Sequence, residues 1–463
     1  MMKRRDALKT IGGLGAAVGM SRFLPGCGDG GAKGINTYVF MMMENRSYDH
    51  FFGARSMAPE NKPGNGLMSP TMYSNLDVHN VPISSFTPGK DQLCALDPPH
   101  GWDAGRAQWN NGANDGFVKV HQMEHSSTTA IEPMQYLVRN DVPVSWALAD
   151  QYATADRWFC SVMGPTWPNR FYWHGASSEG KMDNTLGGTL LQGPSIFHRL
   201  EAKGVNWAYY YGNVPVVSLY QGVNINKVRR FSDFLADAKA GTLPPVVYID
   251  PAFNSNDDHP PVHPINGQEL IATVYSALAM SPQWNNCMFV LTYDEHGGFF
   301  DHVSPPKTID ERAAQGFDQL GFRVPTMVVG PYVKQSYVSS VQHEHCSALR
   351  HIEKTFDLEP LNARSMAAND LSDFLDMDRL AKGEPAEPIQ IPMVDPSDTT
   401  QWPMGAVCST GSIREDHPFI AWADTRPAVL EGMDLRPEVP EYRRMIREHL
   451  AEAESSGVLV RNR

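Results

Sequence analysis

The sequence predicts an α/β fold in which a mostly parallel sheet lies between two layers of helices. Four runs are continuously apolar, as expected of strands buried on both faces: residues 35–43, 244–250, 286–295 and 323–333. Segments of helical period separate these runs: residues 132–140, 195–204, 266–281 and 345–358. Buried strands that alternate with helices indicate a three-layer α/β sandwich.

Residues 35–463 are predicted to form a single domain. The composition, with 42% hydrophobic and 20% charged residues, is that of an ordinary globular protein. Residues 54–130 and 380–440 are rich in Pro, Gly, Asn and Ser and show little periodicity. We expect these two segments to be long ordered loops that form a cap over the sheet.

Residues 1–26 are predicted to be an export signal. Arg4 and Arg5 precede an apolar stretch that is too short to span a bilayer, and they resemble the twin-arginine consensus for export of folded proteins. The letters LPGC, ending at Cys27, resemble a lipobox, so lipidation of Cys27 and simple cleavage both stay open. Residues 27–34 then form a flexible tether. The protein is expected to be periplasmic, membrane-anchored or secreted.

Charge and cysteine usage exclude several classes of function. The signal carries five Lys or Arg and one Asp, a net charge of +4 (5 − 1), so the remaining chain carries −17 (−13 − 4). Nucleic acid is therefore not expected as a partner. The five later cysteines are widely spaced, which allows one or two disulfides in an oxidising compartment and no Cys-based metal centre: Cys94, Cys160, Cys287, Cys346 and Cys408.

Acidic residues follow three of the predicted strands. Glu44 follows the first, Asp250 ends the second, and Asp294 and Glu295 end the third. Because parallel strands place their carboxyl ends at the same edge, these carboxylates should share a crevice. A lone acid such as Asp250 is more often a turn residue or a helix cap. The adjacent pair requires a cation, and its oxygens with those of Glu44 and Asn45 suit a divalent metal ion.

A hydroxyl and three imidazoles are further candidates. Thr166 lies in a Gly-Pro-Thr turn before a predicted helix, where a hydroxyl is ordinarily an N-cap, although a phosphate would also be received there. His100, His259 and His302 lie in polar, Pro-bounded loops beside carboxylates, where imidazoles contact phosphate or donate protons. His343 and the following His345 are expected to be structural.

Five motifs resemble, in order, those of the bacterial phosphoesterase family that contains phospholipases C and acid phosphatases: MMMENRSYDHFFG, DPPHGWDAGRAQWNNGANDGFV, GPTWPNRFYWHG, NDDHPP and TYDEHGGFFDHVSPP. The resemblance spans residues 35–358 and implies a fold similar to that of alkaline phosphatases. It implies a divalent metal ion, with Ca²⁺ or Zn²⁺ the first candidates.

The resemblance also implies a role for each matched residue. Thr166 would be the nucleophile. It would also bind the metal ion, together with Glu44, Asn45, Asp294 and Glu295. His100 and His259 would contact the transferring phosphoryl group. His302 is a weaker candidate for a catalytic role, resting on its place in the Asp-Glu motif.

The expected activity is that of a phospholipase C, because that branch of the family carries Thr as nucleophile. It would hydrolyse the phosphodiester of a phosphatidylcholine-like phospholipid through a phospho-threonine intermediate. Two alternatives are a broad-specificity periplasmic acid phosphatase acting on small phosphate esters and a non-catalytic lipoprotein that binds metal or solute. A redox enzyme ranks last, since neither a Cys cluster nor a dinucleotide fingerprint is present. The large phospholipases of the family carry further domains, whereas only 105 residues (463 − 358) follow the matched region here.

Overall fold

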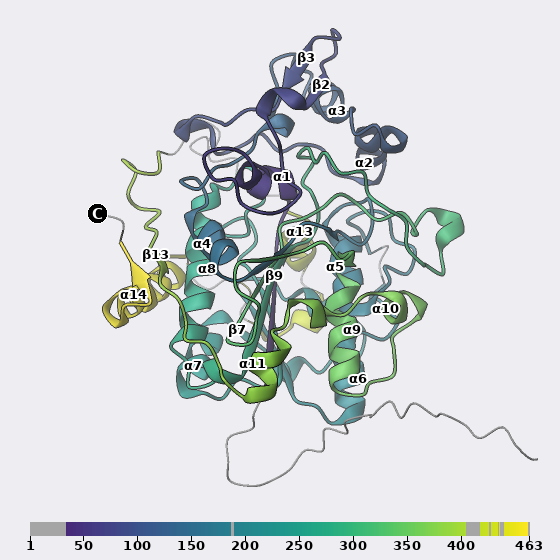
Figure 1. Ribbon diagram of the computed structural model, residues 1–463. Coiled ribbons are helices and arrows are strands. Elements are labelled where there is room, and N and C mark those ends of the chain that lie inside the picture. Colours follow the sequence, from purple (N-terminus) through teal and green to yellow (C-terminus); the bar gives the residue numbers. More distant parts are fainter. Residues whose placement is uncertain are drawn as a thin grey trace, which may run out of the picture. The chain divides into compact units, whose positions relative to one another are not determined.

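The computed structural model contains an eight-stranded sheet with helices on both faces (Figure 1). It describes residues 34–186, 189–403, 417–425, 427–433, 435 and 439–461. The predicted export signal, Cys27 and the tether up to residue 33 lie outside these ranges. Residues Lys33–Arg463 form one compact unit. The predicted boundaries of signal, tether and cap stay predictions.

The strand order in the sheet is β11-β4-β10-β9-β1-β8-β6-β7. The strands are β1 (Thr37–Met43), β4 (Ala153–Ala155), β6 (Trp207–Tyr211), β7 (Val228–Arg230), β8 (Val246–Asp250), β9 (Cys287–Tyr293), β10 (Met327–Val329) and β11 (Tyr337–Ser339). All neighbours pair in parallel except β10, which runs antiparallel to both β9 and β4. The sheet is therefore mostly parallel, as predicted.

The central strand β1 lies between β8 and β9, and its register fixes where the site forms. Met41 is opposite Ile249 in β8, and Met43 is opposite Tyr293 in β9. Every residue of the three strands is buried, in keeping with continuously apolar sequences. Their carboxyl ends meet at one edge of the sheet, which confirms the predicted convergence of the acids that follow them.

Two sequence predictions were wrong in detail. The strand expected at 323–333 is reduced to β10, because Pro325 and Pro331 have no backbone N–H to donate and the amide of Val324 donates instead to the carbonyl of Trp158. The helix expected at 132–140 is a single 3₁₀ turn, Glu132–Met134. The chain after it is extended, because the amide of Tyr136 donates to the carbonyl of Phe86 in another loop.

Helices cover both faces of the sheet, as predicted. On one face lie α4 (Pro143–Gln151), α7 (Phe231–Ala240), α8 (Pro264–Ala279) and α14 (Val439–Ser456); on the other lie α5 (Thr166–Gly175), α6 (Ile196–Lys203), α9 (Cys346–Thr355) and α10 (Ala363–Ala367) (Figure 1). The predicted helices at 195–204, 266–281 and 345–358 correspond to α6, α8 and α9. The three-layer α/β class is confirmed.

Shorter elements make up the remaining loops. The helices are α1 (Tyr48–Phe52), α2 (Trp102–Trp109), α3 (Phe117–Glu124), α11 (Met377–Lys382) and α13 (Pro418–Asp424). The small sheets pair β2 (Ser74–Leu76) with β3 (Pro82–Ser84), β5 (Trp158–Phe159) with β12 (His343–Glu344), and β13 (Ile391–Pro392) with β14 (Leu459–Val460). In the part of the chain that the structure describes, none of the helices combines the length and the apolarity needed to cross a membrane.

Candidate active site

The first strand delivers two polar residues to the edge of the sheet. Glu44 and Asn45 follow β1 and are completely buried. Asn45 has a φ of +60°, a left-handed conformation that Asn tolerates better than most residues. This turn directs its backbone N–H to Oδ1 of Asp294, at 2.9 Å. The turn after β1 is thus fixed to the turn after β9.

The turn after β9 orients two carboxylates. Oδ1 of Asp294 also accepts a hydrogen bond from the amide of Glu295 at 2.7 Å, and the carbonyl of Asp294 accepts one from Nε2 of His345, also at 2.7 Å. Gly297 donates its amide to Oε2 of Glu295 at 2.8 Å. Gly297 has a φ of +61°, and a Cβ there would lie 2.2 Å from the carbonyl oxygen of Asn45, so this close approach requires glycine. His345, expected to be structural, thus contacts the backbone of this turn.

Thr166 is the first residue of α5, but its hydroxyl does not cap the helix. The N-cap is Pro165, which has no side-chain hydrogen bond to the helix. Oγ1 of Thr166 instead donates to Oε2 of Glu44 at 3.3 Å, so the N-cap interpretation was wrong. The amide of Trp167 already donates to Oδ1 of Asn184 at 2.9 Å. The start of α5 therefore presents a hydroxyl to the carboxylate cluster.

Arg170, one helical turn beyond Thr166, supplies positive charge to the cluster. Its Nε donates to Oε1 of Glu44 at 2.9 Å, and its Nη1 donates to Oδ1 of Asp250 at 3.0 Å. Its Nε also lies 3.7 Å from Oδ2 of Asp294. Asp250 is therefore an ion-pair partner, whereas the sequence favoured a turn residue or cap. The sequence interpretation missed Arg170, although its i, i+4 spacing from Thr166 places both on one helix face.

His100 and His259 lie beside the cluster and share one pattern of hydrogen bonds. Nδ1 of His100 donates to the carbonyl of Pro98, and Nδ1 of His259 donates to the carbonyl of Pro260, each at 2.7 Å. These bonds assign the hydrogen of each neutral ring to Nδ1, which leaves Nε2 as an acceptor. Nδ2 of Asn45 lies 3.2 Å from Nε2 of His100 and donates to it. The amide oxygen of Asn45 consequently faces away from His100.

Three buried oxygens of the cluster are left open. Oδ1 of Asn45, Oδ2 of Asp294 and Oε1 of Glu295 have no hydrogen-bond partner among the residues that the structure describes. Burial raises the pKa of Asp294, of Glu295 and of Glu44, and Arg170 opposes this rise for Asp294 and Glu44. Open oxygens with an excess of carboxylates are the donor set that a hard divalent cation takes. The residues present fit such an ion.

The Phosphoesterase family matches residues 35–359. The chain belongs to this family. It is therefore a hydrolase of phosphoester bonds. The non-specific phospholipase C6 of Arabidopsis thaliana is 32% identical over 364 residues, which cover 70% of this chain and 68% of that protein. Phospholipase C A of Mycobacterium tuberculosis is 29% identical over 427 residues, covering 77% and 81%.

Solved structures similar to this phosphoesterase are more distant. A protein in the alkaline phosphatase superfamily from Vibrio parahaemolyticus is 10% identical, with a TM-score of 0.35, covering 50% of this chain and 64% of that chain. A phosphonate monoester hydrolase of Agrobacterium radiobacter is also 10% identical, with a TM-score of 0.35, covering 74% and 77%.

His302 lies in a different cluster of the phosphoesterase. Its Nδ1 donates to Oδ2 of Asp49 at 2.6 Å, and Nη2 of Arg323 donates to Oδ1 of the same carboxylate at 3.1 Å. Asp49, Asp301 and His302 could together hold a metal ion, as could Asp97 with His100 and His259. No contact within the described ranges joins His302 to Glu44 or Thr166. Its catalytic role stays a prediction.

The Asp49–His302 pair makes the stability of the protein depend on pH. Burial lowers the pKa of His302, but the hydrogen bond to Asp49 and the charges of Asp49 and Asp301 outweigh it and raise this pKa above its ordinary 6.5. A histidine whose pKa is higher in the folded than in the unfolded protein stabilises the folded state. This stabilisation is complete below the pKa of the unfolded state and is lost as pH rises through the pKa of the folded state. His302→Gln should therefore lower the free energy of unfolding most near pH 5.5, and this loss should shrink as pH rises toward about 9.

Urea denaturation at several pH values measures this loss. His79→Gln is the matched control, because His79 is exposed. A loss on His302→Gln that is constant across this pH range would contradict the assignment of a charged imidazole.

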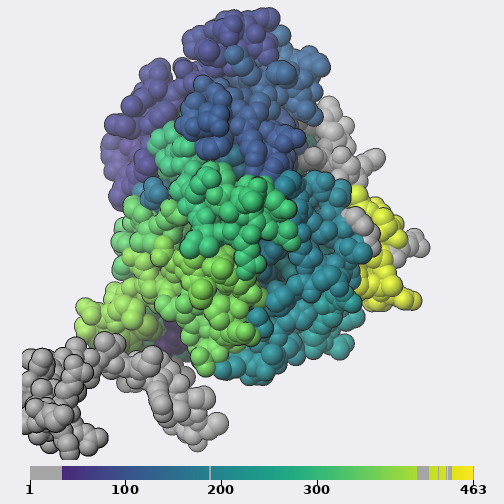
Figure 2. Space-filling model, turned by 90° about the vertical axis from the view of Figure 1, so that its right-hand side faces the viewer, coloured from purple at the N-terminus to yellow at the C-terminus, as the bar shows by residue number. Residues whose placement is uncertain are grey.

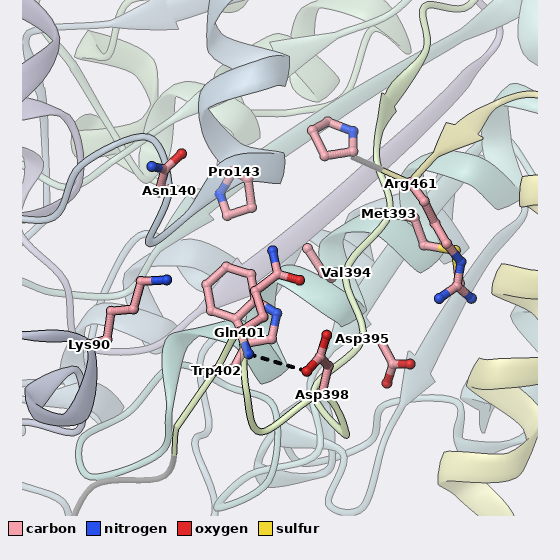
Figure 3. Close-up of a pocket in the computed structure, with 11 residues that line it drawn as sticks. Lys90, Asn140, Pro143, Met393, Val394, Asp395, Asp398, Gln401, Trp402 and Arg461 are labelled. Atoms are coloured by element: carbon pink, nitrogen blue, oxygen red, sulfur yellow. Dashed lines mark hydrogen bonds between the residues drawn. The ribbon is translucent and has the colours of Figure 1, made fainter. Parts of the chain in front are cut away.

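A cavity of about 370 Å³ lies away from the carboxylate cluster (Figure 3). It is lined by Lys90, Asn140, Pro143, Pro392, Met393, Val394, Asp395, Asp398, Gln401, Trp402 and Arg461. In Figure 3, Lys90 and Arg461 lie on opposite sides of this space, and the amide of Gln401 donates to Oδ1 of Asp398 at 3.2 Å. None of the predicted site residues lines it, so the cavity is separate from the candidate active site.

Proposed function

We propose that the protein is an exported, metal-dependent phospholipase C that hydrolyses the phosphodiester of a phosphatidylcholine-like phospholipid. The observation that carries this proposal is the hydroxyl of Thr166, which is held 3.3 Å from Oε2 of Glu44 beside three open oxygens. The names of the relatives support it, since curated relatives from a plant and a bacterium are phospholipases C.

The residues that would hold the metal ion are Glu44, Asn45, Thr166, Asp294 and Glu295. When bound, a divalent cation would favour the ionised form of the Thr166 hydroxyl and neutralise charge on phosphoryl oxygens. Calcium matches an all-oxygen set, and zinc is the other candidate.

Thr166 is proposed to attack phosphorus through Oγ1. A P–O bond to Thr166 would form as its hydroxyl proton passes to Oε2 of Glu44, the acceptor of its hydrogen bond. The P–O bond to the diacylglycerol oxygen would break as that oxygen takes a proton from Nε2 of a protonated His100 or His259 and leaves as an alcohol. His100 and His259 border the site and would contact the transferring group. A water molecule then hydrolyses the phospho-threonine, which releases the phosphorylated head group and restores the hydroxyl.

Comparing three substrates tests this proposal: phosphatidylcholine vesicles, p-nitrophenyl phosphorylcholine and p-nitrophenyl phosphate. A phospholipase C releases diacylglycerol from the vesicles and turns over the soluble diester faster than the monoester. A preference for the monoester would instead indicate the acid phosphatase alternative. Absence of turnover on all three, with metal present, would refute the proposed function.

Metal removal should destabilise the protein. Protein stripped with a chelator retains buried carboxylates without a cation, so Ca²⁺ or Zn²⁺ should raise its Tm on addition. The stabilisation is expected to reach about 2.7 kcal/mol at a metal concentration 100 times Kd. Thermal unfolding with each ion measures it.

Glu295→Gln should weaken this response, whereas Glu269→Gln, a change in α8 outside the cluster, should not. An equal response in both variants would contradict the ligand set.

Exposed apolar side chains around β2, β3 and α3 support a lipid substrate. They are Met68, Met72, Leu76, Val78, Val81 and Met123. The amide of Val78 donates to Oε1 of Gln122 at 3.0 Å, which joins the β2–β3 turn to α3. These elements lie together at the top of Figure 1, and the purple and blue segments at the top of Figure 2 show the same end of the unit. Clustered exposed apolar residues are typical of an interaction surface.

Charged residues on this surface should impair hydrolysis of lipid only. Met72→Glu combined with Met123→Glu should lower the rate on phosphatidylcholine vesicles about tenfold or more, because two side chains lose the free energy of apolar burial. The rate on p-nitrophenyl phosphorylcholine should not change. Met366→Glu combined with Met377→Glu, at exposed positions on α10 and α11, is the matched control. Equal vesicle rates in both double variants would rule this surface out.

Export by the twin-arginine route is also proposed, with Cys27 either lipidated or cleaved away. The disulfide bond of Cys94 supports an oxidising compartment. Cys160, Cys287 and Cys346 are free and buried. Arg4→Lys combined with Arg5→Lys should keep the protein in the cytoplasmic fraction. An unchanged distribution of the protein between cell fractions would contradict this route.

A further inference from the structure

A histidine from outside the matched family region reaches the candidate site. His417 immediately precedes α13, 58 residues beyond residue 359 (417 − 359). Its Nε2 lies 3.6 Å from Oε2 of Glu44, the same oxygen that accepts the hydrogen bond of Thr166. Its side chain is completely buried, and its ring is 5.7 Å from that of His259. Three imidazoles, those of His100, His259 and His417, therefore border the cluster.

The hydrogen bonds of His417 differ from those of the other two histidines. Its Nδ1 accepts a hydrogen bond from the amide of Phe419 at 3.3 Å and so caps α13. Because Nδ1 is an acceptor, the hydrogen of the neutral ring is assigned to Nε2. His100 and His259 have the opposite assignment. Of these three rings, only His417 presents an N–H donor toward Glu44 without taking up a proton.

Packing of α13 holds this donor in place. The ring of Phe419 stacks on that of Trp167, with centroids 5.2 Å apart and planes 10° apart. The ring of Phe253 stacks on His417 itself at 4.8 Å. Trp167 is the neighbour of Thr166 in α5, so α13 is fixed against the helix turn that carries the nucleophile. The position of the donor relative to Oγ1 is therefore set by rigid elements.

We propose that His417 is a further catalytic residue, whose Nε2–H donates a hydrogen bond to a non-bridging oxygen of the phosphoryl group on Thr166. The inference rests on the proposed function. No proton is transferred in this role: the donor stabilises negative charge that develops on the phosphoryl oxygens in the transition state.

Two substitutions separate this role from the helix cap. Asn is a good N-cap residue, so His417→Asn keeps a cap while it removes the donor at the Nε2 position. His417→Gln places an amide donor near that position and loses the cap. The kcat on p-nitrophenyl phosphorylcholine should fall about 100-fold in His417→Asn. It should be closer to wild type in His417→Gln, and inhibition by vanadate should weaken in the same order.

His263→Asn is the matched control, because His263 also precedes a proline, at the start of α8, and its Nδ1 accepts from the amide of Ile265 at 3.1 Å. This variant should keep the wild-type kcat, and thermal unfolding reports the cost of each cap. A kcat in His417→Asn within about twofold of wild type, or a His417→Gln variant no faster than His417→Asn, would overturn the inference. A wild-type protein without turnover or vanadate binding would instead refute the proposed function.

Discussion

Thr166→Val is expected to abolish turnover and leave the folded structure intact. Valine has nearly the shape of threonine, so the start of α5 and the packing around it should persist, while the hydroxyl that attacks phosphorus is lost. Removal of a nucleophile costs about 10³-fold or more in kcat. Thr166→Ser should retain measurable activity, since it keeps a hydroxyl one bond from Cβ.

Turnover of p-nitrophenyl phosphorylcholine, metal content and Tm measure the outcome. Thr273→Val is the matched control, because Oγ1 of Thr273 donates to the carbonyl of Glu269 at 2.7 Å within α8, on the other side of the sheet from α5. Thr166→Val with more than about 1% of wild-type kcat and unchanged metal content would show that another group attacks phosphorus.

The convergence of acids was predictable because it depends on local sequence and one general rule. Fully buried parallel strands are continuously apolar, which identified β1, β8 and β9. Once those strands were parallel, Glu44 and Asp294 had to emerge at the same edge. Strands of three residues, such as β4 and β11, have no such signal, and the antiparallel direction of β10 depends on contacts that local sequence does not encode.

The errors and omissions share a different cause, namely contacts between distant segments. The segment at 132–140 has helical spacing, but its amides donate to Phe86 and to His50. The cap interpretation of Thr166 followed from helix statistics, whereas the partner of its hydroxyl is 122 residues away. His417 is separated from Glu44 by 373 residues (417 − 44), so no spacing pattern could associate them.

Arg170→Met is expected to cause the largest loss of stability of any single change in the site. Arg170 is the buried cation that Glu44 and Asp250 share, and its own side chain is completely buried. Removing one partner of a buried ion pair leaves uncompensated charge and costs about 3–5 kcal/mol of unfolding free energy. Arg461→Met, which breaks an exposed pair with Glu454, is the control and should cost less than about 1 kcal/mol.

The loss should also depend on pH, and its sign follows from the carboxylates. Burial already raises the pKa of Asp250 to about 6, against the lowering effect of Arg170. Without the guanidinium, the pKa of Asp250 in the folded protein rises further. When the pKa of a carboxyl group is higher in the folded than in the unfolded protein, the free energy of unfolding falls as pH rises. Urea denaturation of metal-free Arg170→Met should therefore show a larger deficit near pH 8 than near about pH 5. A deficit that is small and independent of pH would mean that Glu44 and Asp250 are neutral in the folded protein, and the cluster would then lack the negative charge that a divalent cation needs.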